Sequence, residues 1–322
     1  MTVRLNPNVP DNFLVLAEDD SFEGYATMYG DRIAEHYENN GAVVIPHMPI
    51  ACDLEFLQSL TLPFKHNKIG TMNGLDVPVV QRFGDSIGVR GKHPLVALMD
   101  GADVSTLTAN SFELAIYLSQ QIQSFNAQLR AGLRLLFPAS RSLQEANTTW
   151  RLTETPRGPM HLDCFHGGKP LADDVKRLHK LKVFINIDAG PRHWRTSYPL
   201  PELLKVLKPE LPSSLPLDIN QINRLIGCAP GMQAIPAHDV AYGPMSAVIV
   251  NGDMVAHQVV SGRRMVCFEG MCDSADMLSA PVYERLPEWL ADAGYAVAED
   301  AQRFYEDVTQ HTVLPPENRM VA

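Results

Sequence analysis

The chain has 322 residues, of which 45% are hydrophobic and 20% charged, and this ordinary globular composition excludes a mainly disordered protein. Its net charge of −10 would repel phosphate backbones, so we expect no nucleic-acid partner. The apolar runs at 42–45 and 247–250 fall far short of a transmembrane helix, which needs about 20 residues.

The N-terminal residues and the cysteines bear on the location of the protein. The first residues carry no basic segment followed by an apolar one, so nothing predicts export. The five cysteines are scattered and form no Cys-x-x-Cys pair, which is typical of reduced thiols. We therefore expect a cytoplasmic protein, and the sequence leaves its oligomeric state open.

The N-terminal part is predicted to form a helix, a strand and a second helix. Residues 25–39 favour a helix that ends at Asn40 and Gly41, a pair suited to a left-handed C-cap. Residues 42–45 are typical of a short buried strand, and residues 53–60 of another helix.

After short strands around 77–83, the sequence predicts a long helix. Asn110 and Glu113 resemble a capping box at its start, and Pro138 ends it. Apolar residues recur along it every three or four positions, which indicates a helix lying on a sheet; they are Ala115, Leu118, Ile122, Phe125, Leu129 and Leu133.

From residue 147 the pattern changes to short runs of β-forming residues, which predicts a sandwich or a barrel. A proline-rich insertion at 199–233, with short helices at 202–208 and 220–226, interrupts these runs, and residues 287–305 are predicted to be helical. The expected strands are 148–153, 160–165, 181–188, 246–250, 254–260 and 264–268.

The candidate functional residues lie in the segment 159–169, which reads PMHLDCFHGGK. His161 and Asp163 form a His-x-Asp motif, and on a strand both side chains would point to the same face. They could provide two metal ligands. One more histidine would complete a site of two histidines and one carboxylate, which leaves positions open for small molecules and suits a non-haem Fe(II) oxygenase.

His257 is the preferred third ligand. It follows Asn251-Gly252-Asp253, a tight-turn sequence between two apolar runs, so it is expected on a strand soon after a hairpin-like reversal. His257 follows Asp163 by 94 positions, which leaves room for the intervening strands and the insertion.

Three other histidines remain open as alternatives. His166 follows His161 by five residues, which would reverse its face on a continuous strand. His179 lies in the charged run DDVKRLHKLK and is expected to be exposed, and His238 is expected in a loop.

Five segments of the chain carry a resemblance to the Fe(II)/2-oxoglutarate oxygenases, and among them to the bacterial hydroxylases of 3-deoxy-D-manno-octulosonic acid (Kdo). They are NTTWR at 147–151, HLDCF at 161–165, LKVFINID at 181–188, PRHWR at 191–195, and His257 followed by Ser261-Gly262 and Glu269.

The resemblance implies a double-stranded β-helix core, of the jelly-roll or cupin-like type, with buttressing N-terminal helices. It implies iron on His161, Asp163 and His257, with 2-oxoglutarate and O2 as cosubstrates. Succinate and CO2 would be the coproducts. Related halogenases have glycine or alanine where Asp163 stands, so the carboxylate argues against halogenation.

The second carboxylate of 2-oxoglutarate needs a cation, and an arginine fork is better suited to it than a lysine. Many family members place an arginine ten or more residues after the distal histidine, whereas here Arg263 and Arg264 follow His257 by six and seven. Arg264 would share a strand face with Val266 and Phe268, which suits a barrel interior. The candidates are Arg195 and Arg264 first, then Arg151, with Lys182 and Asn186 sharing a face on a neighbouring strand.

The sequence therefore predicts a single α+β oxygenase domain over 1–322. Residues 1–140 would form a support of helices and strands, 147–272 the jelly-roll core with its insertion, and 273–322 a helical tail. We expect hydroxylation of an unactivated C–H bond of a small molecule or sugar acid, with Kdo lipid or a soluble biosynthetic compound as substrate. The alternative from another class is a non-catalytic cupin-like protein that binds a metal or ligand, including a structural zinc site.

Overall fold

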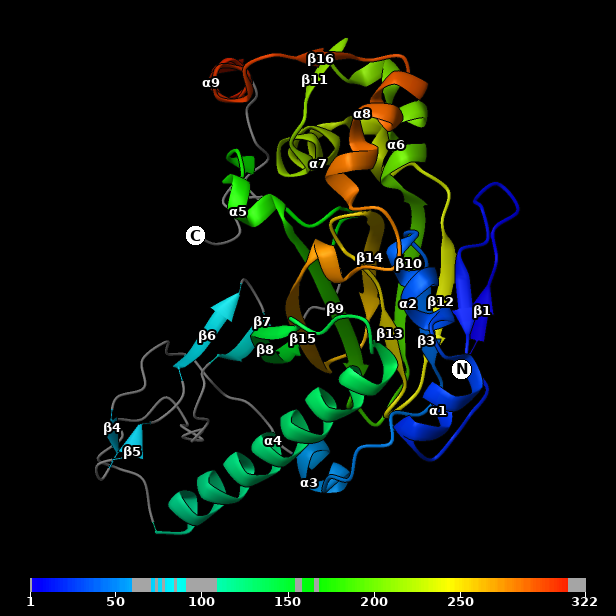
Figure 1. Ribbon diagram of the computed structural model, residues 1–322. Helices are drawn as coiled ribbons and strands as arrows, with labels where there is room; N and C mark the ends of the chain where they lie inside the picture. Colours follow the sequence, from blue (N-terminus) through cyan, green and yellow to red (C-terminus); the bar gives the residue numbers. More distant parts are fainter. Residues whose placement is uncertain are drawn as a thin grey trace.

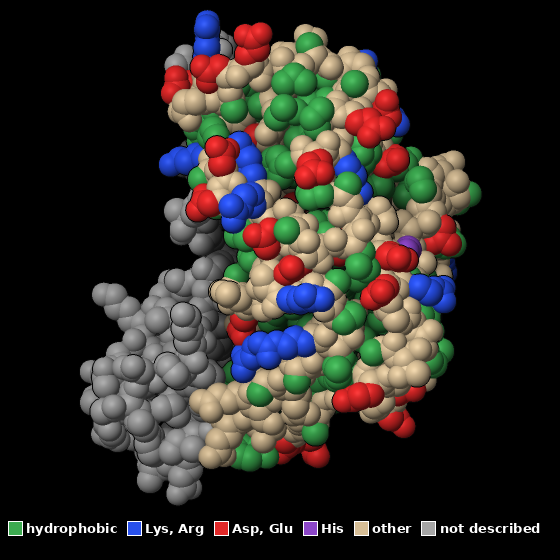
Figure 2. All heavy atoms as spheres, viewed as in Figure 1, with side chains coloured by type: hydrophobic (Ala, Val, Ile, Leu, Met, Phe, Trp, Pro, Cys, Tyr) green, Lys and Arg blue, Asp and Glu red, His purple; other side chains and the backbone are tan. Residues whose placement is uncertain are grey.

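The structure, a computed structural model, describes residues 2–59, 71–72, 75–76, 79–83, 86–90, 109–153, 158–164 and 168–311 (Figure 1). In that part of the chain, no helix combines the length and apolar composition needed to cross a membrane. Among the same residues, the face in Figure 2 carries acidic and basic side chains interspersed with apolar ones.

Two mainly antiparallel sheets carry the fold together with helices, so the predicted α+β combination of helices and sheets is confirmed. The larger sheet has the strand order β2-β3-β13-β9-β15-β8-β7-β6, in which only the β2–β3 pair is parallel. Its strands are β2 Phe13–Val15, β3 Ala42–Ile45, β13 Ala247–Ile249, β9 Leu178–Asn186, β15 Arg264–Asp273, β8 Gln144–Thr153, β7 Ser86–Arg90 and β6 Val79–Phe83.

The smaller sheet has the order β1-β12-β10-β14 and is antiparallel throughout. Its strands are β1 Thr2–Arg4, β12 His238–Tyr242, β10 Arg192–Pro199 and β14 Val255–Ser261. A separate pair of two-residue strands, β4 Thr71–Met72 and β5 Leu75–Asp76, lies outside both sheets.

Apolar side chains fill both faces of the larger sheet. On β3, Val43 and Ile45 pack in a helix-side core with residues of α1, α2 and α4, whereas Ala42 and Val44 pack in an inter-sheet core with residues of the smaller sheet. Side chains alternate between the two faces of a strand, so a strand buried on both faces is apolar at every position. All four residues of β3 are accordingly buried.

The helix-side core is formed by α1 Phe22–Tyr29, α2 Arg32–Glu38, α3 Leu54–Ser59 and α4 Ala109–Leu136. The single helix predicted at 25–39 is wrong, because Gly30, with φ +51°, ends α1 and separates it from α2. Asn40, with φ +65°, lies at the predicted left-handed end. The long helix α4 is confirmed, but it begins at Ala109, so Asn110 lies inside its first turn.

The insertion and the C-terminal segment pack together above the sheets in Figure 1. α6 contacts α8, and β11 pairs in parallel with β16. The tail helix predicted at 287–305 is wrong, since two helices and a strand stand there and Pro287 lies inside α8. The elements are α5 Asp173–Lys176, α6 Leu200–Val206, η3 Lys208–Glu210, β11 Ser214–Pro216, α7 Ile219–Cys228, η4 Pro230–Gln233, η5 Ser274–Asp276, α8 Val282–Asp292, β16 Ala296–Ala298 and α9 Ala301–His311.

Five of the six expected strands are confirmed, with shifted ends, as β8, β9, β13, β14 and β15. The strand expected at 160–165 is wrong, because residues 162–164 have no strand geometry and the structure does not describe 165–167. β10 and β12 were not predicted, and they complete the smaller sheet.

Candidate metal centre

The His-x-Asp segment is a loop that touches β14 at one point. His161 forms an isolated antiparallel bridge with His257, through N–H to O distances of 3.0 and 2.9 Å. The amide of Asp163 donates to the carbonyl of Gly252 at 2.8 Å. The expected alternation still holds over three residues, since Leu162 is buried in the inter-sheet core while His161 and Asp163 approach His257.

The turn before His257 connects the two sheets. Asn251 and Gly252 follow β13 of the larger sheet, and β14 of the smaller sheet begins at Val255, so the expected hairpin is wrong. A Cβ at residue 252 would lie 2.0 Å from Oδ2 of Asp163 and 3.0 Å from Cε1 of His257. Only glycine fits between the two functional side chains at this position.

The side chains of His161, Asp163 and His257 form a group in which one ligand atom from each lies within 4.8 Å of the others. Nδ1 of His161 contacts the carbonyl of Pro159 at 2.9 Å, and Nδ1 of His257 contacts that of Val255 at 3.0 Å. A carbonyl can only accept, so each Nδ1 donates, and Nε2 is the ring nitrogen left to offer a lone pair. These rings are therefore in the tautomer that binds a metal through Nε2.

Burial and nearby charges keep two of these groups in their metal-binding protonation states. Burial first, and then the neighbouring His161, lower the pKa of His257 to about 3, so its ring is neutral at pH 7. Burial alone would raise the pKa of Asp163, but the ammonium of Lys182 and the neighbouring His257 outweigh it and hold that pKa well below its usual range. Asp163 is thus a carboxylate.

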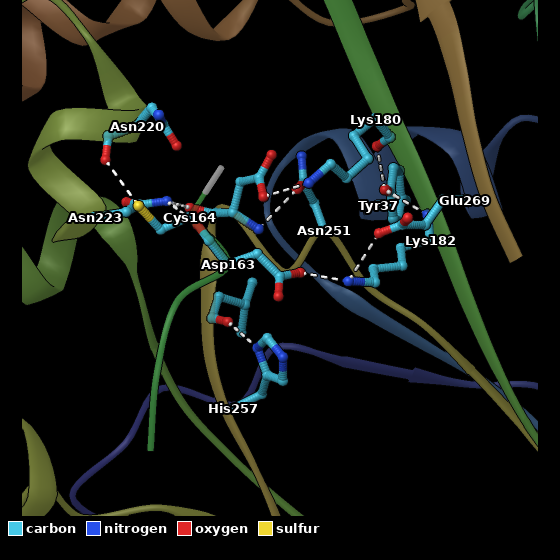
Figure 3. A network of polar contacts seen from close by, with 12 residues as sticks. Tyr37, Asp163, Cys164, Lys180, Lys182, Asn220, Asn223, Asn251, His257 and Glu269 are labelled. Atoms are coloured by element: carbon cyan, nitrogen blue, oxygen red, sulfur yellow. Dashed lines mark hydrogen bonds and ion pairs between the residues drawn. The ribbon is translucent and has the colours of Figure 1, made fainter. Parts of the chain in front are cut away.

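Lys182 connects Asp163 to a second acid. Its Nζ lies 2.6 Å from Oδ2 of Asp163 and 3.0 Å from Oε1 of Glu269, and Figure 3 shows the ammonium between the two carboxylates. Beside it, Lys180 forms an ion pair with Asp253 at 2.6 Å. Lys180 and Lys182 are alternate residues of β9, so both point to the inter-sheet face of the larger sheet.

Aromatic rings pack around His257 between the sheets. Trp194 of β10 and Phe184 of β9 have ring centroids 5.8 and 6.2 Å from the imidazole. Thr196 stands directly opposite His257 in the β10–β14 register and is fully buried. His257 itself is 4% exposed, so this side of the centre is shielded from water.

Among the described residues, the alternative histidines His179 and His238 do not join this group. His166 lies outside the described residues. His179 was expected to be exposed, which is wrong, since it is buried in β9. His238 was expected in a loop, which is also wrong: it is buried in β12, where its Nδ1 accepts from the amide of Asn6 at 2.9 Å.

The two arginines ranked first for 2-oxoglutarate are paired elsewhere. Arg195 lies on the face of β10 opposite to Trp194, and its Nε is 3.4 Å from Asp239. Arg264 pairs with Asp188 at 3.0 Å. The expectation that Arg264 shares a barrel interior with Val266 and Phe268 is wrong, because those two side chains belong to the helix-side core.

The remaining candidates have different positions. Asn186 donates to the carbonyls of Gly190 and Tyr242, both at 3.0 Å, and so holds the loop after β9. Lys182 contacts Asp163, as described above. Arg151 belongs to β8 and stands directly opposite Met265, which is in turn opposite Asn186. The side chain of Arg151 lies outside the described part of the structure.

Several residues of the centre were not predicted from the sequence: Gly252, Glu269 and the role of Lys182 toward Asp163. A signal for Lys182 exists in the sequence. Two lysines at alternate positions of the mostly apolar run KLKVFIN, residues 180–186, require acidic partners if that strand is buried.

Comparison with solved structures bears on the fold. The Kdo hydroxylase KdoO, described as a non-heme Fe(II) alphaketoglutarate dependent dioxygenase, matches in complex with succinate and Fe(III) at TM-score 0.58 and 19% identity, covering 86% of this chain and 96% of that chain. The chain has the fold of this hydroxylase. KdoO with alphaketoglutarate and Fe(III) gives TM-score 0.58, 19% identity and coverages of 88% and 96%. KdoO with cobalt(II) gives TM-score 0.57 and 20% identity, covering 90% of this chain and 98% of that chain.

Sequence comparisons add nothing to this likeness to KdoO. No protein-family model matches the chain, and no curated protein matches it.

Proposed function

We propose that the chain is a non-haem Fe(II)/2-oxoglutarate-dependent dioxygenase that hydroxylates an unactivated C–H bond. The observation that carries the proposal is the group of His161, Asp163 and His257, with two imidazoles and one carboxylate whose ligand atoms lie within 4.8 Å of one another. Two histidines and one carboxylate with open positions are the ligand set of non-haem Fe(II) oxygenases. Support comes from the fold of KdoO, which was crystallised with iron and alphaketoglutarate.

In this proposal the three residues hold Fe(II) through Nε2 of each histidine and the carboxylate of Asp163, in a jelly-roll core. Bound iron with 2-oxoglutarate and O2 would supply an oxidation that yields succinate, CO2 and a hydroxylated substrate. The chain contributes a preset ligand geometry, because Nδ1 of each ring is fixed by a backbone carbonyl. Trp194 and Phe184 keep water from one side of His257.

For the second carboxylate of 2-oxoglutarate we propose Arg151. Arg195 and Arg264 form ion pairs with Asp239 and Asp188. The register places residue 151 in the row of Met265 and Asn186, on a strand that pairs with β15 of the larger sheet. Arg151→Gln should weaken 2-oxoglutarate binding and leave metal binding intact, and equal 2-oxoglutarate affinity in both proteins would exclude this role.

The substrate is proposed as a sugar acid such as Kdo or a soluble small molecule of a biosynthetic pathway. The net charge of −10 gives no general attraction to anionic membrane lipid, which favours the soluble class. Succinate release with free Kdo, Kdo lipid, amino acids and nucleosides as separate additions distinguishes these classes.

The alternative of a structural zinc site has less support. Structural zinc prefers four protein ligands, whereas the group found among the described residues has three. Metal content alone does not decide the matter, because zinc or nickel binds such ligands more tightly than iron.

The decisive experiment measures O2 consumption that depends on 2-oxoglutarate. We expect it in the Fe(II)-loaded protein, with succinate as product, and expect its loss in His161→Ala. His193→Ala, which removes an exposed histidine of β10, is the matched control and should retain the activity. Activity that survives in His161→Ala would refute the proposal.

A further inference from the structure

Lys182 is a buried cation between two partly buried acids. Its side chain is 7% exposed, and those of Asp163 and Glu269 are 21% and 23% exposed. Glu269 stands directly opposite Lys182 in the β9–β15 register, so the two side chains share one face of the larger sheet. The strand register therefore fixes the Lys182–Glu269 pair independently of the loop that carries His161 and Asp163, here called the metal loop.

The backbone of Asp163 is fixed by contacts on both sides. Its amide donates to Gly252 at 2.8 Å, and its carbonyl accepts from Nδ2 of Asn223 at 2.9 Å. Asn223 also donates to the carbonyl of Asp253 at 2.7 Å, so it joins the metal loop to the turn before His257. These contacts place the Cα of Asp163 but leave the rotation of its carboxylate open, because the last torsion of an aspartate is broad.

We propose that Lys182, held by Glu269, is a positioning residue for the metal centre. Its ammonium binds Oδ2 of Asp163 at 2.6 Å and thereby leaves Oδ1 as the oxygen that binds the metal. One-oxygen binding keeps a coordination position open for a small molecule. This inference rests on the metal centre of the proposed function and adds a residue that touches the metal ligand, not the metal.

The charges of this group allow the positional role to be separated from simple electrostatics. With Asp163 and Glu269 ionised and Lys182 protonated, the three side chains carry a formal charge of −1. The double variant Lys182→Met/Glu269→Gln also carries −1, but it has no ammonium at Oδ2. Glu269→Gln alone carries 0, and it keeps both Lys182 and an acceptor for it. Because Glu269 is replaced together with Lys182, the double variant leaves no unpaired carboxylate at residue 269, which would destabilise the fold.

The test is titration of the purified full-length protein with Co(II), together with the visible spectrum of the bound ion and a thermal unfolding curve. We expect the double variant to bind Co(II) about tenfold more weakly than the wild type, as is usual when a partner of a metal ligand is removed. We expect it to bind more weakly than Glu269→Gln, and the spectrum of its bound Co(II) to shift.

Charge alone predicts the opposite order, with the double variant equal to the wild type and Glu269→Gln weaker than both. That order, or an unchanged spectrum, would overturn the positional role. A wild-type protein that binds no Co(II) would instead refute the proposed metal centre itself. Unfolding curves show whether each variant is folded, and a second double variant, Lys182→Leu/Glu269→Gln, replaces the first if it is not.

Discussion

Gly252→Ala tests the geometry of the centre with a single methyl group. The added Cβ would lie 2.0 Å from Oδ2 of Asp163, whereas ordinary contact begins at 3.4 Å, so one of the two must move by about 1.4 Å. Asp163 cannot move freely, because Lys182 holds the same oxygen at 2.6 Å and the amide of Asp163 donates a hydrogen bond to the carbonyl of Gly252.

The displacement should be visible in both metal affinity and stability. We expect Co(II) affinity to fall about 10- to 100-fold, as for the loss of a residue that orients a metal ligand. Overpacking of this kind also costs about 1–3 kcal/mol in the free energy of unfolding. Calorimetric titration with Co(II) and urea unfolding measure the two effects.

Gly227→Ala is the matched control. A Cβ at Gly227 meets nothing within 4 Å, and the residue lies in α7, where alanine favours helix over glycine. This variant should bind Co(II) as the wild type does and be no less stable. If Gly252→Ala also binds Co(II) like the wild type, the arrangement of Asp163 around residue 252 is wrong.

Three further outcomes are expected. Co(II) should raise the unfolding temperature of the wild type but not of His161→Ala, because a ligand stabilises only the state that binds it; equal shifts would contradict the metal site. Burial and then Arg285 lower the pKa of His179 to about 4 in the folded protein. As the pH falls, His179 is therefore protonated in the unfolded chain before it is in the folded one, and the free energy of unfolding should decline between about pH 6.5 and 4 by up to about 3 kcal/mol. His179→Gln should flatten that part of the stability profile, and an unchanged slope would show that another group causes it. Asn223→Ala should lower the free energy of unfolding by about 1–3 kcal/mol, since it leaves the carbonyls of Asp163 and Asp253 without their donor, and urea unfolding with an unchanged midpoint would contradict that.

The candidate ligands could be predicted from the sequence although the local structure was not. Alternation around Leu162 brings His161 and Asp163 to one side in a loop as it would in a strand. The loop itself depends on bonds to Gly252 and Asn223, which are distant in sequence. No local pattern reports such contacts.

The position of Arg264 shows why strand faces were harder to assign. β15 is covered by helices on one face and by the inter-sheet contacts on the other, so apolar residues occur on both. Alternation then identifies two faces without saying which one is the interior. The pairing of Arg264 with Asp188 follows from the register of β9 and β15, which sequence does not provide.

β10 was missed although its sequence carries a usable signal. Trp194 and Thr196 are buried, while His193 and Arg195 alternate with them on the other face, which is the two-residue period of a strand. The proline-rich insertion was predicted to begin at residue 199, which is the last residue of β10, and the strand before it was overlooked.

The central claim is that His161, Asp163 and His257 hold Fe(II) with a site open to 2-oxoglutarate. The most direct test is anaerobic titration of the Fe(II)-loaded protein with 2-oxoglutarate, followed by its visible absorption. We expect a new absorption band that saturates in the wild type and in His193→Ala and is absent in His257→Ala. No band in the wild type, or the same band in His257→Ala, would contradict it.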